Sequence, residues 1–111
     1  MQAQLVQNDR RLHYVQEALG RIESRQLSNI DSDNLNDYEF RVFSQWGEDG
    51  IIQHLIRSID IPKNYFVEFG VQDYREANTR FLLVNNNWSG LVMDASAANI
   101  KTITKDLIYW A

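Results

Sequence analysis

The chain has 111 residues and a formal net charge of −4 at pH 7, because 11 basic residues face 15 acidic ones. This balance, without a local basic cluster, excludes a typical nucleic-acid binder. The absence of cysteine excludes a disulfide framework and a thiolate metal site. No secretory signal and no apolar run of the ~20 residues that a membrane span needs is present. We therefore expect a globular, cytoplasmic protein without a membrane span.

Residues 1–27 contain no proline and predict one continuous helix. Apolar residues recur at spacings of seven, three, four and three, which places them at heptad positions a and d of one stripe. One interpretation is a coiled coil that joins copies of the chain into a homo-oligomer. The other is an amphipathic helix that lies on its own domain or on another part of the protein. The stripe consists of Leu5, Leu12, Val15, Leu19 and Ile22.

Residues 28–40 carry four acidic side chains and no basic one, and are otherwise rich in asparagine and serine. These side chains compete for backbone hydrogen bonds and favour turns over regular structure. The acidic residues lack a defined ligand spacing, so we predict no metal site here. The segment is interpreted as an acidic linker or an irregular approach to the domain that follows.

Residues 41–111 show the pattern of an α/β domain, in which short apolar strands ending near glycine or aspartate alternate with helices. This order predicts a parallel pair of strands joined by a crossover helix. Two strands do not form an independently stable sheet, so we expect a truncated doubly wound domain; the alternative is a domain completed by oligomerisation. The predicted elements are a helix with an apolar stripe at Ile51, Ile52, Leu55, Ile56 and Ile59, strands 65–69 and 90–94, a helix over 78–86 and a helix over 97–108.

Three residues at the strand ends are candidates for ligand binding. Glu68 is a charge inside an apolar strand, and needs a partner such as a backbone amide or a ligand amine. Gly70 permits close backbone approach at the following turn. Asp94 ends the second strand 24 positions after Gly70, near the spacing at which an acid accepts hydrogen bonds from the ribose of a bound nucleoside. The pair predicts a nucleoside site at this edge of the sheet.

Four ordered segments carry a resemblance to a known family: Ser44-Gln45-Trp46-Gly47-Glu48-Asp49, Val67-Glu68-Phe69-Gly70, Asn78-Thr79, and Trp88-Ser89-Gly90-Leu91-Val92-Met93-Asp94. They resemble the N-terminal half of the FkbM-like S-adenosylmethionine-dependent methyltransferases over residues 43–96. The resemblance implies a Rossmann-like fold, S-adenosylmethionine as cofactor, and a small-molecule or glycan hydroxyl as acceptor. It also implies that Glu68 and Gly70 line the methionine end of the cofactor and that Asp94 holds the ribose. Gln45, Glu48 and Asp49 lie in a loop that we expect to pass near the strand ends, and are further candidates; the alternative is that they only form the N-terminus of the following helix.

The sequence departs from the family pattern at Gln72 and Tyr74, where glycines are expected; Tyr74 is therefore expected to narrow the pocket or close over it. The catalytic residues and the adenine-binding segment are expected beyond Ala111, so the bare chain is expected to be inactive. A second hypothesis is a non-enzymatic oligomerisation module with a degenerate nucleotide-binding remnant. A third, a nicotinamide-dependent oxidoreductase, is disfavoured because Gly-x-Gly-x-x-Gly is absent.

Overall fold

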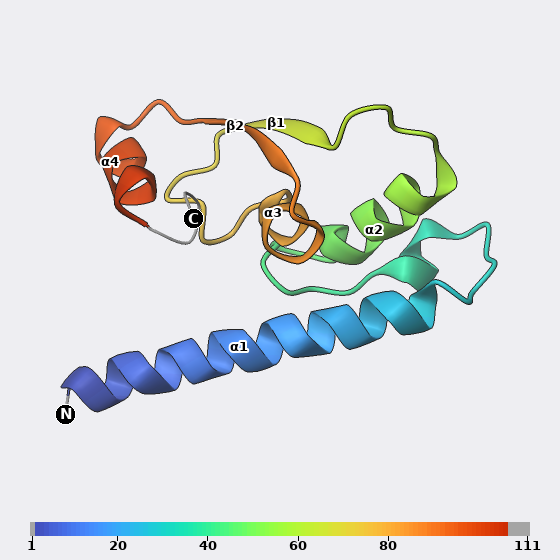
Figure 1. The fold of residues 1–111 in the computed structure, drawn as a ribbon, viewed down its shortest axis with the longest axis horizontal. Coiled ribbons are helices and arrows are strands. Elements are labelled where there is room, and N and C mark those ends of the chain that lie inside the picture. The colour runs from blue at the N-terminus through green and yellow to red at the C-terminus, as the bar shows by residue number, and fades with distance from the viewer. Residues whose placement is uncertain (1, 107–111) are drawn as a thin grey trace.

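The computed structural model describes residues 2–106. A long N-terminal helix runs along one side of an α/β unit, as Figure 1 shows. The last predicted helix, over 97–108, ends at Lys105, because Asp106 adopts an extended conformation; its predicted residues 107 and 108 lie outside the described residues. In chain order the elements are α1 (Gln2–Leu27), the 3₁₀ helix η1 (Leu35–Tyr38), α2 (Glu48–Ser58), β1 (Tyr65–Phe69), α3 (Arg80–Asn86), β2 (Ser89–Met93) and α4 (Ala97–Lys105).

The two strands form a parallel sheet in which Tyr65 pairs with Ser89 and Phe69 pairs with Met93. Helix α3 lies between them in the chain, so the predicted strand pairing and connecting helix are confirmed. Asn87 ends α3 in the left-handed conformation with φ of 57°, which reverses the chain into β2. The fold of the described residues is therefore mixed α/β, built on a two-stranded parallel sheet.

One face of the sheet forms the main core. Phe66 and Val92 point from the strands into a cluster completed by Tyr74, Leu82 and Ile103. A Cβ added at Gly90 would lie 2.4 Å from Cδ1 of Phe66. Glycine at this position therefore allows the Phe66 ring to lie across β2.

The opposite face of the sheet is apolar and exposed. Side chains alternate between the two faces of a strand, so every second residue of β1 and β2 points to this side. The exposed fractions range from 42% at Met93 to 78% at Phe69. Residues 2–106 thus cover the sheet from one side only. The exposed apolar residues are Tyr65, Val67, Phe69, Leu91 and Met93.

Helix α1 packs on the domain through Gly20, Ser24 and Leu27. A Cβ at Gly20 would lie 2.4 Å from Val42 and 2.8 Å from Phe81, so the helix backbone approaches the domain closely. The carbonyl oxygen of Ser24 accepts a 2.8 Å hydrogen bond from Arg57 of α2. The predicted apolar stripe of α1 does not take part in this packing, because all five of its residues are exposed.

Helix α2 and the preceding segment pack together. The Tyr38 ring stacks on His54 with ring centroids 3.6 Å apart, and the Tyr38 hydroxyl accepts a 2.8 Å hydrogen bond from the Ser32 amide. The acidic segment 28–40 is therefore anchored on α2. The predicted inward stripe of α2 is partly wrong, since Leu55 is 41% and Ile59 is 59% exposed. Contacts with residues 38–44, α1 and α3, which periodicity does not reveal, bury Asp49, Gly50 and Gln53 instead.

Candidate functional site

The Glu68 carboxylate is held by the N-terminal end of α3. Its Oε1 accepts hydrogen bonds from the Thr79 amide at 2.9 Å and the Thr79 hydroxyl at 2.6 Å. Its Oε2 accepts a 3.2 Å bond from the Asn78 amide. The half-buried charge therefore has the partners that the sequence required, and they are mainly backbone amides. A carboxylate offers about four acceptor positions, so one remains for a further donor.

The loop after β1 contains three residues in the left-handed conformation. Gly70, Gln72 and Tyr74 have φ of 71°, 55° and 67°. Two of them are the positions at which the family pattern led us to expect glycine. This conformation costs a residue with a Cβ roughly 1–2 kcal/mol, so the chain keeps the loop geometry at some cost in stability. A Cβ at Gly70 would meet no atom within 4 Å, so the backbone there faces open space.

The Asp94 carboxylate joins the end of β2 to this loop. Its Oδ1 accepts a 2.9 Å hydrogen bond from the Gln72 amide, and its Oδ2 accepts 3.0 Å bonds from the Ser96 amide and from Nδ2 of Asn99. The Asn99 side chain, and then the Ser96 and Gln72 amides, hold the pKa of Asp94 below its ordinary value, because these bonds favour the charged form. Three of about four acceptor positions are filled. One acceptor position therefore remains for a further donor.

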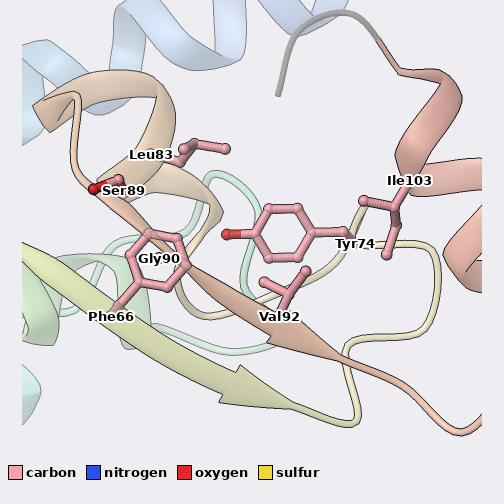
Figure 2. Close-up of a pocket in the computed structure, with 7 residues that line it drawn as sticks. All are labelled: Phe66, Tyr74, Leu83, Ser89, Gly90, Val92 and Ile103. Atoms are coloured by element: carbon pink, nitrogen blue, oxygen red, sulfur yellow. The ribbon is translucent and has the colours of Figure 1, made fainter. Parts of the chain in front are cut away.

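Tyr74 is buried inside the core rather than closed over the strand ends. Its side chain is 2% exposed, and its hydroxyl lies 2.7 Å from the Thr79 hydroxyl. Figure 2 shows its ring between Phe66 and Ile103. These residues line a cavity of about 190 Å³ on the helix-covered side of the sheet. The cavity lining does not include Glu68, Gly70 or Asp94. The cavity lining consists of Phe66, Tyr74, Leu83, Ser89, Gly90, Val92 and Ile103.

The Ser-Gln-Trp-Gly-Glu-Asp segment forms a hydrogen-bonded loop around a buried aspartate. Oδ2 of Asp49 accepts bonds of 2.7, 2.7 and 3.0 Å from the amides of Val42, Phe43 and Ser44. The Ser44 hydroxyl in turn accepts a 3.2 Å bond from the Asp49 amide. Asp49 is 1% exposed and Ser44 is fully buried. Both residues therefore organise the loop, a role that the sequence interpretation missed because it treated Asp49 as a first-turn or pocket-facing residue.

Gln45 and Glu48 occupy the exposed side of the same loop. Gln45 is exposed and takes no part in the hydrogen bonds described for Glu68 and Asp94. Oε2 of Glu48 accepts a 3.0 Å bond from the Trp46 amide. Burial raises the pKa of Glu48, yet hydrogen bonds from nearby amides and from Ser44 outweigh it and hold that pKa below its ordinary value. The structure thus joins Asp94 to the Gly70 loop, and leaves Gln45 outside that network.

The described residues define two further properties of the chain. Within residues 2–106, no helix is both long and apolar enough to cross a membrane. In the same part of the chain, no group of three histidine, aspartate or glutamate side chains is arranged to hold a metal ion.

Comparisons of this chain with models of known protein families, with curated proteins and with solved structures found no match. The roles of individual residues therefore rest on the geometry given above.

Proposed function

We propose that the chain is the S-adenosylmethionine-binding half of a Rossmann-like methyltransferase of the cytoplasm. Its acceptor would be a hydroxyl group of a small molecule or glycan. The observation that carries the proposal is the Asp94–Gln72 hydrogen bond, which fixes an acid at the end of β2 against the first loop after β1. In open α/β sheets, nucleotides bind outside the carboxyl ends of the strands at such a loop.

The residues at this edge fit the polar ends of the cofactor. The open space beside Gly70 leaves room for a ligand against the backbone. One free acceptor position on Asp94 suits a ribose hydroxyl, and one on Glu68 suits the ammonium group of the methionine moiety. Gln45 would contribute only from the rim of the site. The resemblance of residues 43–96 to the methyltransferase family supports the same assignment.

Methyl transfer requires no covalent bond between the substrate and the protein. The cofactor, when bound, supplies an electrophilic methyl group. The chain's own task is to hold the ribose through Asp94 and the ammonium through Glu68, so that acceptor and methyl lie in line. We assign no catalytic base to residues 2–106, and we expect the 111-residue chain to bind the cofactor weakly and to transfer no methyl group.

An NMR titration of the ¹⁵N-labelled chain with S-adenosylhomocysteine tests this proposal. We expect dose-dependent shifts of the Gly70, Gln72 and Ser96 amides at millimolar ligand. Asp94→Asn should raise the Kd for S-adenosylhomocysteine by at least about tenfold, which corresponds to about 1.4 kcal/mol of binding free energy. The matched control Asp73→Asn, a change in the same loop, should bind like the original chain. Shifts absent at about 5 mM ligand, or shifts confined to other residues, would refute the proposal.

A second candidate, the non-enzymatic module, is favoured by one observation. Protein donors already fill three acceptor positions on Glu68 and three on Asp94, so both carboxylates are largely satisfied without a ligand. If this candidate is correct, neither S-adenosylhomocysteine nor adenosine shifts the loop amides. NADH serves as the control for a nicotinamide site, and shifts with NADH alone would favour an oxidoreductase.

A further inference from the structure

The apolar stripe of α1 is exposed along its whole length. Its five residues follow a heptad pattern and are between 43% and 63% exposed. Asn8 occupies the first d position and Gln26 the last a position, so a polar residue stands at each end of the stripe. We call these a and d positions the α1 seam. The apolar members of the seam are Leu5, Leu12, Val15, Leu19 and Ile22.

The domain packs on the side of α1 opposite the seam. Gly20 and Leu27 occupy b positions and Ser24 an f position of the same heptad, and all three are buried or half-buried against the domain. Positions b and f lie on the far side of a helix from a and d. Figure 1 shows α1 running beside the domain with its other side free. A partner helix can therefore reach the seam without displacing the domain.

We propose that copies of this chain associate through the α1 seam as a parallel, in-register coiled coil of more than two helices. In this arrangement each seam residue faces its own counterpart. All five apolar positions then meet apolar ones, and Asn8 meets Asn8. A polar residue that faces its own kind inside a seam specifies register.

Antiparallel arrangements fit the same seam less well. The register that places Leu5 opposite Ile22 also places Asn8 against Leu19. A second register pairs Asn8 with Gln26 but leaves Leu5 without a helical partner. That second register also brings like charges together beside the seam, because the charged residues at e positions are acidic and those at g positions are basic. The like-charged pairs would be Asp9 with Glu23 and Arg11 with Arg25.

The seam composition indicates the number of helices. Leucine at a with β-branched residues at d favours three- or four-helix bundles over dimers, and here d holds Val15 and Ile22. The contact area points the same way. A 26-residue helix is about 39 Å long and about 10 Å across, so its lateral surface is roughly 1,200 Å². In a dimer, the partner helix would cover about a third of this lateral surface, well below the ~800 Å² per partner of a stable interface. Contact with two neighbouring helices doubles the buried area of each helix.

Sedimentation equilibrium of the full chain tests the proposal. We expect a mass three or four times the 13.0 kDa of one chain. The double variant Leu12→Lys/Leu19→Lys should be monomeric, while Val6→Lys/Tyr14→Lys, which changes equally exposed apolar residues outside the seam, should keep the assembly. Circular dichroism and urea unfolding of both variants check that the domain remains folded.

Chain direction is tested with a single cysteine, since the sequence contains none. Gln4→Cys should form disulfide-linked pairs on mild oxidation, because a parallel bundle places residue 4 of each copy at the same end. In the antiparallel register that places Leu5 opposite Ile22, the two sulfurs would lie about 29 Å apart along the axis, by 1.5 Å per residue, and in the second antiparallel register they would lie farther apart. A monomeric or dimeric full chain, or a seam variant that stays assembled, would overturn the proposal. So would a monomer that instead cosediments with anionic lipid vesicles through the same residues.

Discussion

The hydroxyl groups of Tyr74 and Thr79 lie 2.7 Å apart, and the Thr79 hydroxyl also donates to Glu68 at 2.6 Å. Since Thr79 has one hydroxyl proton and gives it to the carboxylate, Tyr74 must be the donor to Thr79. The chain of hydrogen bonds therefore runs from the buried ring to the charged end of β1. It ties the left-handed loop, the start of α3 and the sheet together.

Replacement of Thr79 by valine should break this chain. Thr79→Val removes the hydroxyl that accepts from Tyr74 and donates to Glu68, but retains the volume of the side chain. We expect the free energy of unfolding to fall by about 2 kcal/mol, typical of losing hydrogen bonds to a charged group. Urea unfolding followed by circular dichroism measures the loss. Thr79→Ser keeps the hydroxyl and should lie within about 1 kcal/mol of the original, and equal losses in both variants would contradict the role of the hydroxyl.

Asp49→Ala should destabilise the domain more than any change on the exposed side of the same loop. Three buried backbone amides lose their acceptor, and each such bond to a charged group is worth about 1.5–3 kcal/mol. Because the bonds are not additive, we expect a total loss of about 3–5 kcal/mol. Glu48→Ala, one position earlier, should cost about 1 kcal/mol or less. Comparable losses in the two variants would show that the loop is not organised around Asp49.

Glycine at position 72 should relieve the left-handed backbone. Gln72→Gly keeps the amide that bonds to Asp94, and should leave the stability unchanged or raise it by up to ~1 kcal/mol. Gln72→Val should lower it by about 1–2 kcal/mol, because a β-branched residue tolerates positive φ poorly. Thermal unfolding of both variants is the measurement. A glycine variant less stable than the valine variant would argue against a positive φ here.

Acid should weaken the link between β2 and the Gly70 loop. The pKa of Asp94 in the folded chain lies below its ordinary value of 3.8, so the unfolded chain takes up a proton first as the pH falls. The stabilisation is therefore complete well above pH ~4 and is lost as the pH drops through the lowered pKa. Asp94→Asn should show a shallower loss of unfolding free energy between about pH 4 and pH 2. An identical acid profile in the variant and the original chain would contradict this assignment.

Much of the α/β part could be predicted from local pattern. The apolar runs that form β1 and β2 are short, as expected of strands. Each is followed by glycine or aspartate, residues that are common in turns. The helical period was equally clear in α1, but period alone does not say which stripe meets the domain. Gly20 decides this, because the backbone approaches Val42 too closely for a side chain.

The polar contacts of the candidate site were predicted less well. The need of Glu68 for a partner followed from burial of a charge in an apolar strand, and the structure supplies one. The engagement of Asp94 by the Gln72 amide could not be predicted, since it depends on a loop conformation that non-glycine residues rarely adopt. The burial of Tyr74 could not be predicted for the same reason. Its backbone has a positive φ and its ring lies in the core, and the pattern of apolar and polar residues does not reveal which residues adopt a positive φ.

The loop around Asp49 closes over only five to seven positions of the chain, whereas Tyr65 and Ser89 pair across 24. Short loops lose less entropy on closure, and contacts between near neighbours in sequence form faster than parallel pairing. We therefore expect the Asp49 loop and α2 to act as an early folding nucleus on which the sheet assembles later. Substitutions in this loop should slow refolding, while substitutions in β2 should mainly accelerate unfolding.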